Sequence, residues 1–253
     1  MSLSEVVAAL DLPPDALIEQ RVPKKLLLEH DAPTASDRRQ IQDGIEEITW
    51  IAALKPTNIG VPAYQDDTRE YLEIAVLSVS LRAKAKTGRL VELIHRAVPY
   101  PVLLATANQD GVSISLAHKR QSQGEAGKVV IEDLRATPAL QLDSPDQRLT
   151  TFLQSLALEQ QPRSNLYVLY QGWIDRLTAF AASQVTQHFN LPDSPEQTEA
   201  RQVALTDHER LMRELTSLRS MATKEPQISR RVALNLEIQR LEAELTKTIE
   251  AMR

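Results

Sequence analysis

The sequence predicts an α+β fold: a small mixed sheet with a β-α-β-β core, then an α-helical region and a C-terminal antiparallel two-helix coiled-coil arm. Three observations support this prediction. Apolar residues alternate in the middle of the chain, recur at helical spacing further on, and follow a four-three repeat in the last quarter. With 253 residues, 42% of them hydrophobic and only 7 glycines, the chain can bury a substantial core.

The first forty residues carry helix caps and chain breakers at short intervals. Ser4 can cap a helix over residues 5–10, and the proline pair at 13 and 14 breaks the chain. Further short helices are expected over 15–20 and from Ser36 to about 43.

Residues 45–118 carry the strand pattern of the body. A strand is expected over 45–54, with Ile48, Trp50, Ala52 and Leu54 on one face. Apolar periodicity further along the chain predicts a strand over 73–82 and a helix over 88–98. Two more strands are predicted over 102–107 and 112–118, and an Asp-Gly turn joins them. The order is β-α-β-β, and a right-handed crossover would lay the helix on one face of the sheet.

Beyond this core the strand signals fade after 129–134. A helix is expected over 149–158, and Asn165 can cap a long helix over 166–188. We therefore predict an α+β body over 1–140, a helical region packed on it over 141–193, and a helical hairpin over 194–253.

The hairpin is predicted from its heptads. The apolar seam residues on the two sides of Pro226 are Leu211, Leu215, Leu218, Leu234, Ile238, Leu241 and Leu245. Each seam covers only about three heptads, so a hairpin of this length is marginal alone. We expect it to contact a protein partner or a second copy, while a plain structural hairpin is an equal alternative.

Composition excludes several classes of site. There are no cysteines, which removes disulfides and thiol catalysis and suits a cytoplasmic protein. No leader peptide and no membrane-spanning run is expected. The five histidines form no metal-binding motif, and the common nucleotide loops are absent. We therefore predict no metal, no cofactor and no assigned catalytic residue.

Charge is unevenly distributed, although the net charge is only −5. Residues 81–128 hold eight Lys and Arg against three Asp and Glu. The candidate functional cleft gathers these cations with nearby histidines, a tyrosine and a carboxylate: His95, Arg96, Tyr100, His118, Lys119, Arg120 and Glu73. Arg82, Lys84 and Lys86 would join them if the strand over 73–82 ends near the same edge, so that a basic rim over 82–120 could contact nucleic acid.

A metal-dependent nuclease is the main alternative. Glu73 opens one expected strand and Glu47 lies in the preceding one, so their carboxylates could converge on Mg²⁺. The acidic-x-Lys pattern of restriction-type nucleases does not occur in the chain.

The chain also resembles a known family along nearly its whole length. The matching segments are 48–50, 54–56, 71–74, 94–101, 117–120, 165–167 with Tyr170, and 231–235. They resemble a prokaryotic family called domain of unknown function 4391. The family is uncharacterised, so the resemblance carries over no site residue, but it implies a setting near DNA methyltransferases and helicases of restriction or phage-defence type.

Together these observations predict a non-enzymatic accessory subunit of a prokaryotic DNA-processing, restriction or phage-defence assembly. The hairpin would contact protein and the basic rim nucleic acid. An atypical metal-dependent nuclease and a purely structural oligomerisation protein are the alternatives.

Overall fold

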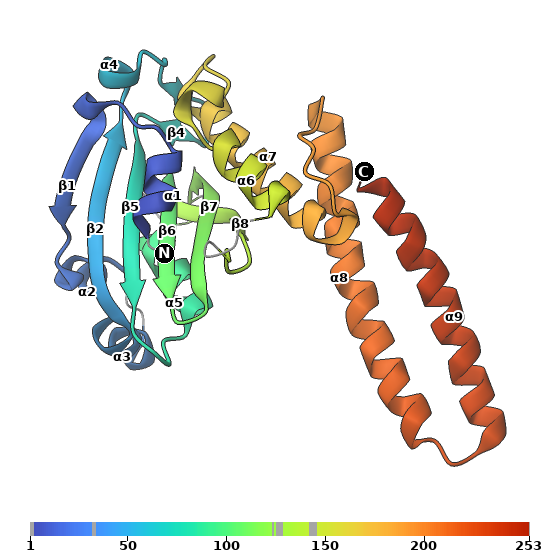
Figure 1. Cartoon of the computed structure of the whole chain (residues 1–253). Helices are drawn as coiled ribbons and strands as arrows, with labels where there is room; N and C mark the ends of the chain where they lie inside the picture. Colours follow the sequence, from blue (N-terminus) through green and yellow to red (C-terminus); the bar gives the residue numbers. More distant parts are fainter. Residues whose placement is uncertain (1–2, 32–33, 123, 125–128, 142–145, 253) are drawn as a thin grey trace. The chain divides into compact units, whose positions relative to one another are not determined.

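The computed structural model describes residues 3–31, 34–122, 124, 129–141 and 146–252. The chain divides into two compact units, Met1–Leu177 and Thr178–Arg253 (Figure 1). The division falls within helix α7 (Leu166–Thr186), so the helical region expected over 141–193 is shared between the units.

The first unit is built on a mixed sheet. Its six strands lie in the order β1-β2-β5-β6-β7-β8, and every neighbouring pair except β5 and β6 is antiparallel. Their bounds are β1 Leu17–Arg21, β2 Ile45–Leu54, β5 Ile74–Leu81, β6 Val102–Asn108, β7 Gly111–Gln121 and β8 Val129–Ala136. The parallel pair is joined through helix α5 (Thr87–Ala97), which confirms the predicted β-α-β-β core.

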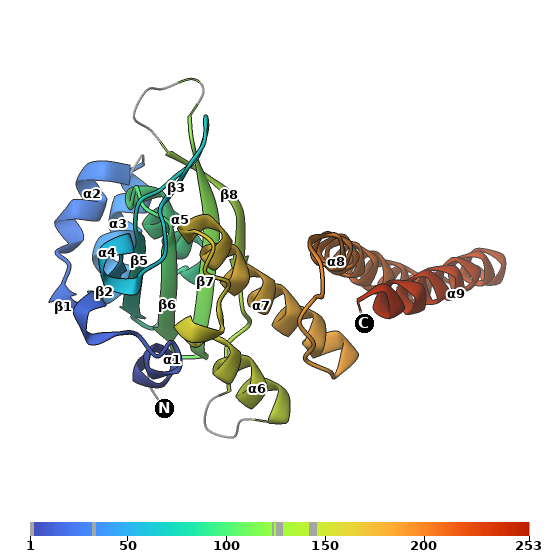
Figure 2. The ribbon, with the colours of Figure 1, turned by 90° about the horizontal axis from the view of Figure 1, so that it is seen from above.

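Helices cover both faces of this sheet. On one face α5 packs with α2 (Lys24–Asp31) and α3 (Ala35–Gly44) over an apolar core that contains Leu77 and Leu104. On the other face lie α1 (Leu3–Ala9), α6 (Gln147–Ser155) and the first part of α7 (Figure 2). Short elements complete the unit: the 3-10 turns Pro14–Ala16 and Leu158–Gln160, helix α4 Pro56–Ile59, and the small ladder of β3 Tyr64–Gln65 with β4 Glu70–Tyr71.

Long-range pairing overrides local pattern at the start of the chain. The helix expected over 15–20 is instead a 3-10 turn followed by strand β1, whose Leu17 pairs with Ala52 of β2. All five β1 side chains are exposed, so no apolar alternation marked it as a strand. Helix α2 was not expected either.

A bulge in β2 also changes which residues share a face. Trp50 pairs with Leu77, but Ala52 pairs with Val76, so the register shifts between them. Ile48 and Trp50 therefore face the core under α5, whereas Ala52 and Leu54 do not belong to that core. The predicted single face of four residues is wrong, because a bulge inserts one extra residue into the alternation.

The second unit contains the expected helix pair. Ser194 caps α8 (Pro195–Lys224) by accepting a hydrogen bond from the Gln197 amide, and α9 (Ile228–Ala251) returns antiparallel after a short turn (Figure 1). The described contacts between the helices form a seam of Leu211, Leu215 and Leu241 with Leu218, Ile238 and Leu245. Leu234, predicted in the same seam, is half-buried and is not a member of this cluster.

The base of the helix pair is held by a buried arginine. Arg201 Nε donates to the carbonyl of Met252 at 3.0 Å, and Arg201 Nη1 donates to the carbonyl of Asn190 at 2.6 Å. These bonds anchor the end of α9 to the segment that precedes α8. Within the described part of the chain, no helix is long and apolar enough to cross a membrane.

Candidate functional site

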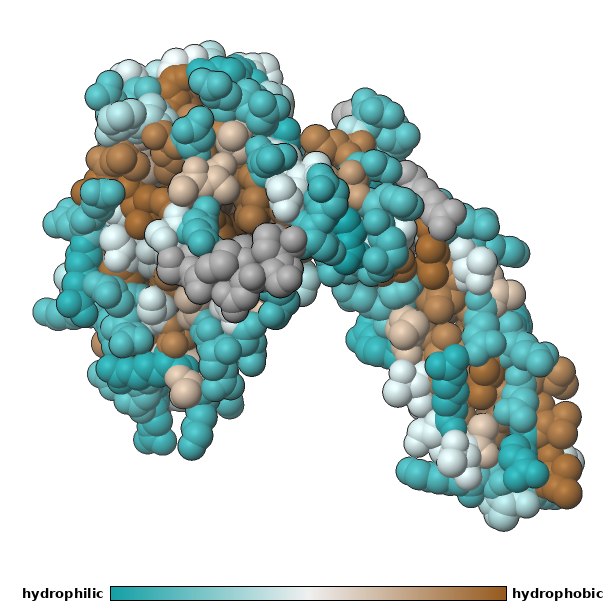
Figure 3. Space-filling model, in the orientation of Figure 1, coloured by the Kyte–Doolittle hydropathy of each residue, from teal (hydrophilic) through white to brown (hydrophobic). Residues whose placement is uncertain are grey.

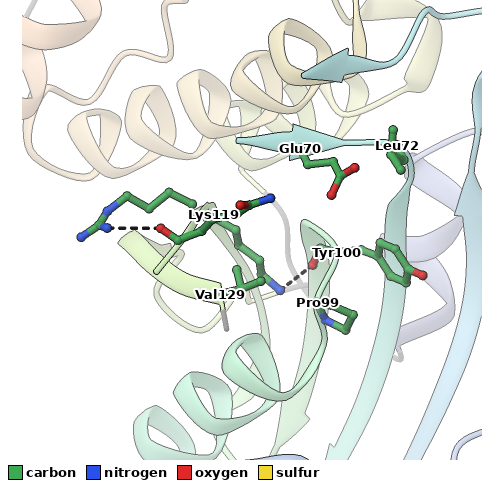
Figure 4. Close-up of a pocket in the computed structure, with 8 residues that line it drawn as sticks. Glu70, Leu72, Pro99, Tyr100, Lys119 and Val129 are labelled. Atoms are coloured by element: carbon green, nitrogen blue, oxygen red, sulfur yellow. Dashed lines mark hydrogen bonds between the residues drawn. The ribbon is translucent and has the colours of Figure 1, made fainter. Parts of the chain in front are cut away.

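A pocket of about 310 Å³ lies in the first unit where four segments meet, namely β4, the turn from α5 to β6, β7 and β8. It is lined by Glu70, Leu72, Pro99, Tyr100, Lys119, Arg120, Gln121 and Val129 (Figure 4). β7 runs antiparallel to β6, so Lys119 near the end of β7 lies beside the turn that leads into β6.

Lys119 is the buried lysine of this pocket. Its side chain passes Val129 and ends beside Tyr100 (Figure 4), and only 3% of the residue is exposed. Its Nζ donates hydrogen bonds to the carbonyls of Val98 and Tyr100, which follow the last turn of α5. Burial lowers the pKa of Lys119 to about 7, because leaving water penalises the ammonium form.

His95 lies in the core on the α5 side of the sheet and is fully buried. Its Nε2 lies 3.0 Å from Ser115 Oγ, while its Nδ1 has no hydrogen-bond partner among the described residues. Burial, with a smaller contribution from the charge of Lys119, lowers the pKa of His95 to about 3. His95 is therefore neutral at physiological pH.

His118 lies on the opposite side of the sheet, within a chain of hydrogen bonds. Its Nε2 lies 2.7 Å from Gln171 Oε1, so this nitrogen carries the proton, and its Nδ1 accepts from the Tyr71 hydroxyl at 2.5 Å. Gln171 Nε2 in turn donates to Asp175 Oδ1 at 2.7 Å. Burial lowers the pKa of His118 and raises that of Asp175.

Aromatic rings surround His118. Tyr167 stacks between His118 and Tyr64, with centroid distances of 4.8 and 5.0 Å. Tyr71 and Tyr170 approach the His118 ring edge-on, at 5.9 and 5.5 Å. Four of the five tyrosines in the chain thus gather around one histidine.

The arginines near this cluster are paired with one carboxylate. Arg69 Nη2 and Arg120 Nε contact Glu132 at 3.1 and 3.0 Å, and the Arg69 guanidinium lies 5.7 Å from the centroid of the Tyr167 ring. Arg120 therefore shares its carboxylate partner with Arg69 at the edge of the pocket.

The predicted cleft is divided in the structure. Tyr100, Lys119 and Arg120 line one pocket, but His95 and His118 lie on opposite faces of the sheet. The other two residues form ion pairs: Arg96 with Glu92 at 3.5 Å, and Glu73 with Lys55 at 3.2 Å.

The basic rim is divided as well. Because β5 and β6 are parallel, the end of β5 lies beside the far end of β6, where Ser80 pairs with Ala107. Arg82, Lys84 and Lys86 follow that end, whereas Lys119 lies at the start of β6. The condition for both groups to share one edge is therefore not met, because the parallel pairing places the end of β5 at the far end of β6.

The two carboxylates of the nuclease hypothesis do not converge. Glu47 pairs with Ser80, whereas Glu73 precedes Ile74, which pairs with Leu54 at the other end of the same ladder. Among the described residues, no group of three or more His, Asp or Glu side chains is arranged to hold a metal ion.

Sequence reasoning did not identify the cluster around His118 as a unit. One signal was present in α7, where Tyr167, Tyr170 and Gln171 recur at helical spacing on one face. No sequence pattern placed Tyr71 opposite them, because β4 has only two residues.

A third feature lies on the helix pair. Ile228, Val232 and Leu236 follow one another at every fourth residue of α9 and are 69%, 52% and 62% exposed. They lie on the side of α9 away from the seam with α8, and Figure 3 shows apolar surface along the outer edge of this helix near the turn. We call these three residues the outer stripe.

Comparison with known proteins gives one match. Neither a curated protein nor a solved structure matches the chain. The family model described as "Domain of unknown function (DUF4391)" matches residues 10–245, nearly the whole chain. The family that the sequence motifs resembled is thus confirmed, and the chain belongs to this family of domains of unknown function.

Proposed function

We propose that this protein is a non-enzymatic interaction subunit that docks through the outer stripe of α9. In the setting that the family resemblance implied, it would serve a DNA-processing, restriction or phage-defence assembly in the cytoplasm. The observation that carries the proposal is the stripe itself, because three large apolar side chains are each more than half exposed on one helix face. Contiguous exposed apolar surface is typical of interaction sites.

The charge pattern beside the stripe favours a second copy of α9 as its occupant. At about 100° per residue, Arg231 and Glu242 lie on the same flank of the stripe, about three turns apart. When two antiparallel helices are related by a twofold axis, the same flank of each helix meets its copy. Each Arg231 would therefore face Glu242 of the other copy. The twofold axis would then cross α9 midway between Arg231 and Glu242, next to Leu236. In the single chain Glu242 Oε1 already accepts from Arg219 Nη2 at 2.7 Å, so a contact with Arg231 of the second copy would add to this pair.

The test is the solution mass of the full chain as a function of concentration, measured by sedimentation. We expect a dimer that is lost in the triple variant Ile228→Gln, Val232→Gln, Leu236→Gln. The chain offers a matched control, because Val203, Met212 and Met221 are exposed apolar residues of α8. Their triple glutamine variant should dimerise like the wild type. A chain that stays monomeric at all concentrations, or equal loss in both variants, would overturn the proposal.

The second part of the hypothesis is a contact between the basic rim and nucleic acid. Lys119 is buried, and Arg96 and Arg120 each contact a carboxylate, so none of these three rim residues is an exposed cation without such a contact. It stays a prediction, tested by salt-dependent binding of duplex DNA to the wild type and to Arg96→Gln, Arg120→Gln. No geometric observation favours the nuclease alternative.

A further inference from the structure

We propose that Lys119 is a reactive amine in the pocket between β4 and β7, and that this pocket takes a small aldehyde, which Lys119 binds covalently as an imine. The inference is independent of the proposed docking function. It rests on the burial of Lys119, on its two hydrogen-bond acceptors and on the pocket that it lines.

The two acceptors match the neutral form of the amine. A neutral primary amine has two N–H groups and one lone pair, and the carbonyls of Val98 and Tyr100 accept both N–H groups. Tetrahedral geometry then directs the lone pair away from these carbonyls, and we infer that it faces the pocket, which Lys119 lines. An ammonium in the same place would have a third N–H to satisfy.

The charges around Lys119 also favour the neutral amine. Its pKa is lowered to about 7 by burial, and among the described residues no carboxylate contributes to the shift. His95, which is neutral, is the charged or titratable neighbour on α5, and Glu70 and Arg120 line the same pocket without contributing to the shift. At pH 7 about half of the amine would be neutral, against roughly one part in three thousand for a lysine of ordinary pKa.

The chemistry is that of imine formation. The Nζ lone pair attacks the aldehyde carbon, and the carbonyl oxygen takes up a proton to give a carbinolamine. The C–O bond then breaks, and the oxygen leaves as water with both amine hydrogens, so that amine and aldehyde yield imine and water without an oxidant or reductant. If the product is protonated, its single N–H can keep one of the two carbonyl bonds.

The pocket suits a small ligand with an apolar body. Leu72, Tyr100 and Val129 supply apolar walls, and Glu70 and Gln121 supply polar atoms at the edge. A volume of about 310 Å³ is at the lower end of the range for small-molecule sites.

The test uses the wild-type full chain with propanal as probe. Borohydride reduction traps any imine as a stable secondary amine, and peptide mass mapping then locates the modified lysines. At pH 7 we expect labelling of Lys119 at least about tenfold faster than that of Lys55, whose side chain is half exposed and whose ammonium pairs with Glu73. Labelling of Lys55 and other exposed lysines with Lys119 unmodified would overturn the proposal.

Variants sharpen the result. Lys119→Arg should remove the fast-labelling site, while Lys86→Arg, which changes an exposed lysine, should keep it. If Lys119→Arg does not fold, peptide mass mapping of the wild type still tests the proposal, because it compares the labelling of different lysines within one molecule. Equal labelling rates for Lys119 and Lys55 at pH 7 would also contradict the proposal.

Discussion

His118 and Lys119 are neighbours in the chain, yet their side chains lie on opposite faces of the sheet. His118 is hydrogen-bonded to Gln171 of α7, while Lys119 donates to the carbonyls of Val98 and Tyr100 after α5. Because successive strand residues point to opposite faces, two adjacent residues have different surroundings. His118 lies among tyrosine rings and in a chain of hydrogen bonds, whereas the buried amine of Lys119 lies at a pocket.

The first prediction concerns Lys119 and alkaline pH. Its pKa is about 7 in the folded protein and 10.5 when unperturbed, so between these values the unfolded chain binds more protons. The free energy of unfolding should therefore rise with pH across this window, by roughly 2 kcal/mol from pH 7 to pH 9. In Lys119→Met this rise should disappear. Urea titration, monitored by tryptophan fluorescence, measures the free energy of unfolding at each pH, because Trp50 and Trp173 both lie in the first unit. The same rise in the variant would contradict the account.

A second prediction concerns His95 and acid. The folded pKa of about 3 lies below the unperturbed value of 6.5, so the unfolded chain again binds more protons between them. Stability should fall as the pH falls through this window, by roughly 2 kcal/mol more in the wild type than in His95→Gln between pH 7 and pH 5. Parallel acid profiles of the two proteins would show that His95 is not buried and neutral.

The third prediction tests the hydrogen bond between Tyr71 and His118. Tyr71→Phe removes the hydroxyl and leaves Nδ1 of His118 without its donor, which should cost about 1 to 3 kcal/mol of unfolding free energy. Tyr100→Phe is the control, because Tyr100 is 37% exposed and should change stability little. Nitrogen chemical shifts of the His118 ring should change only in the first variant.

A fourth prediction separates the seam of the helix pair from its outer stripe. Leu215 is 2% exposed, so Leu215→Ala should destabilise the pair by about 2 to 5 kcal/mol. Leu236→Ala should have little effect at concentrations where the chain is monomeric, because that side chain is 62% exposed. Hydrogen exchange of peptides from α8 and α9 distinguishes the two. Similar protection in both variants would show that Leu215 is not part of the seam.

Sequence patterns located the elements that have strong local periodicity. Strand β5, helix α5 and the helix pair were predicted because each repeats its apolar residues over several turns or pleats. Strand β1 was missed because its stability comes from pairing with β2 and its side chains carry no pattern.

The candidate site was less predictable for a related reason. Patterns along the chain place His118 and Lys119 on a strand but do not state what covers each face. The partners of these residues come from Gln171, far along the chain, and from backbone carbonyls at the end of α5, which no side-chain pattern reports.

The central claim is that two copies of α9 pair antiparallel through the outer stripe, and disulfide trapping tests it most directly. The chain contains no cysteine, so one introduced residue gives an unambiguous result. The proposed pairing places Leu236 next to the twofold axis, within disulfide reach of its copy. Under mild oxidation, Leu236→Cys should form a covalent dimer, whereas Val203→Cys, similarly exposed on α8, should stay monomeric. If both variants crosslink to the same extent, or if Leu236→Cys remains monomeric, the pairing is wrong.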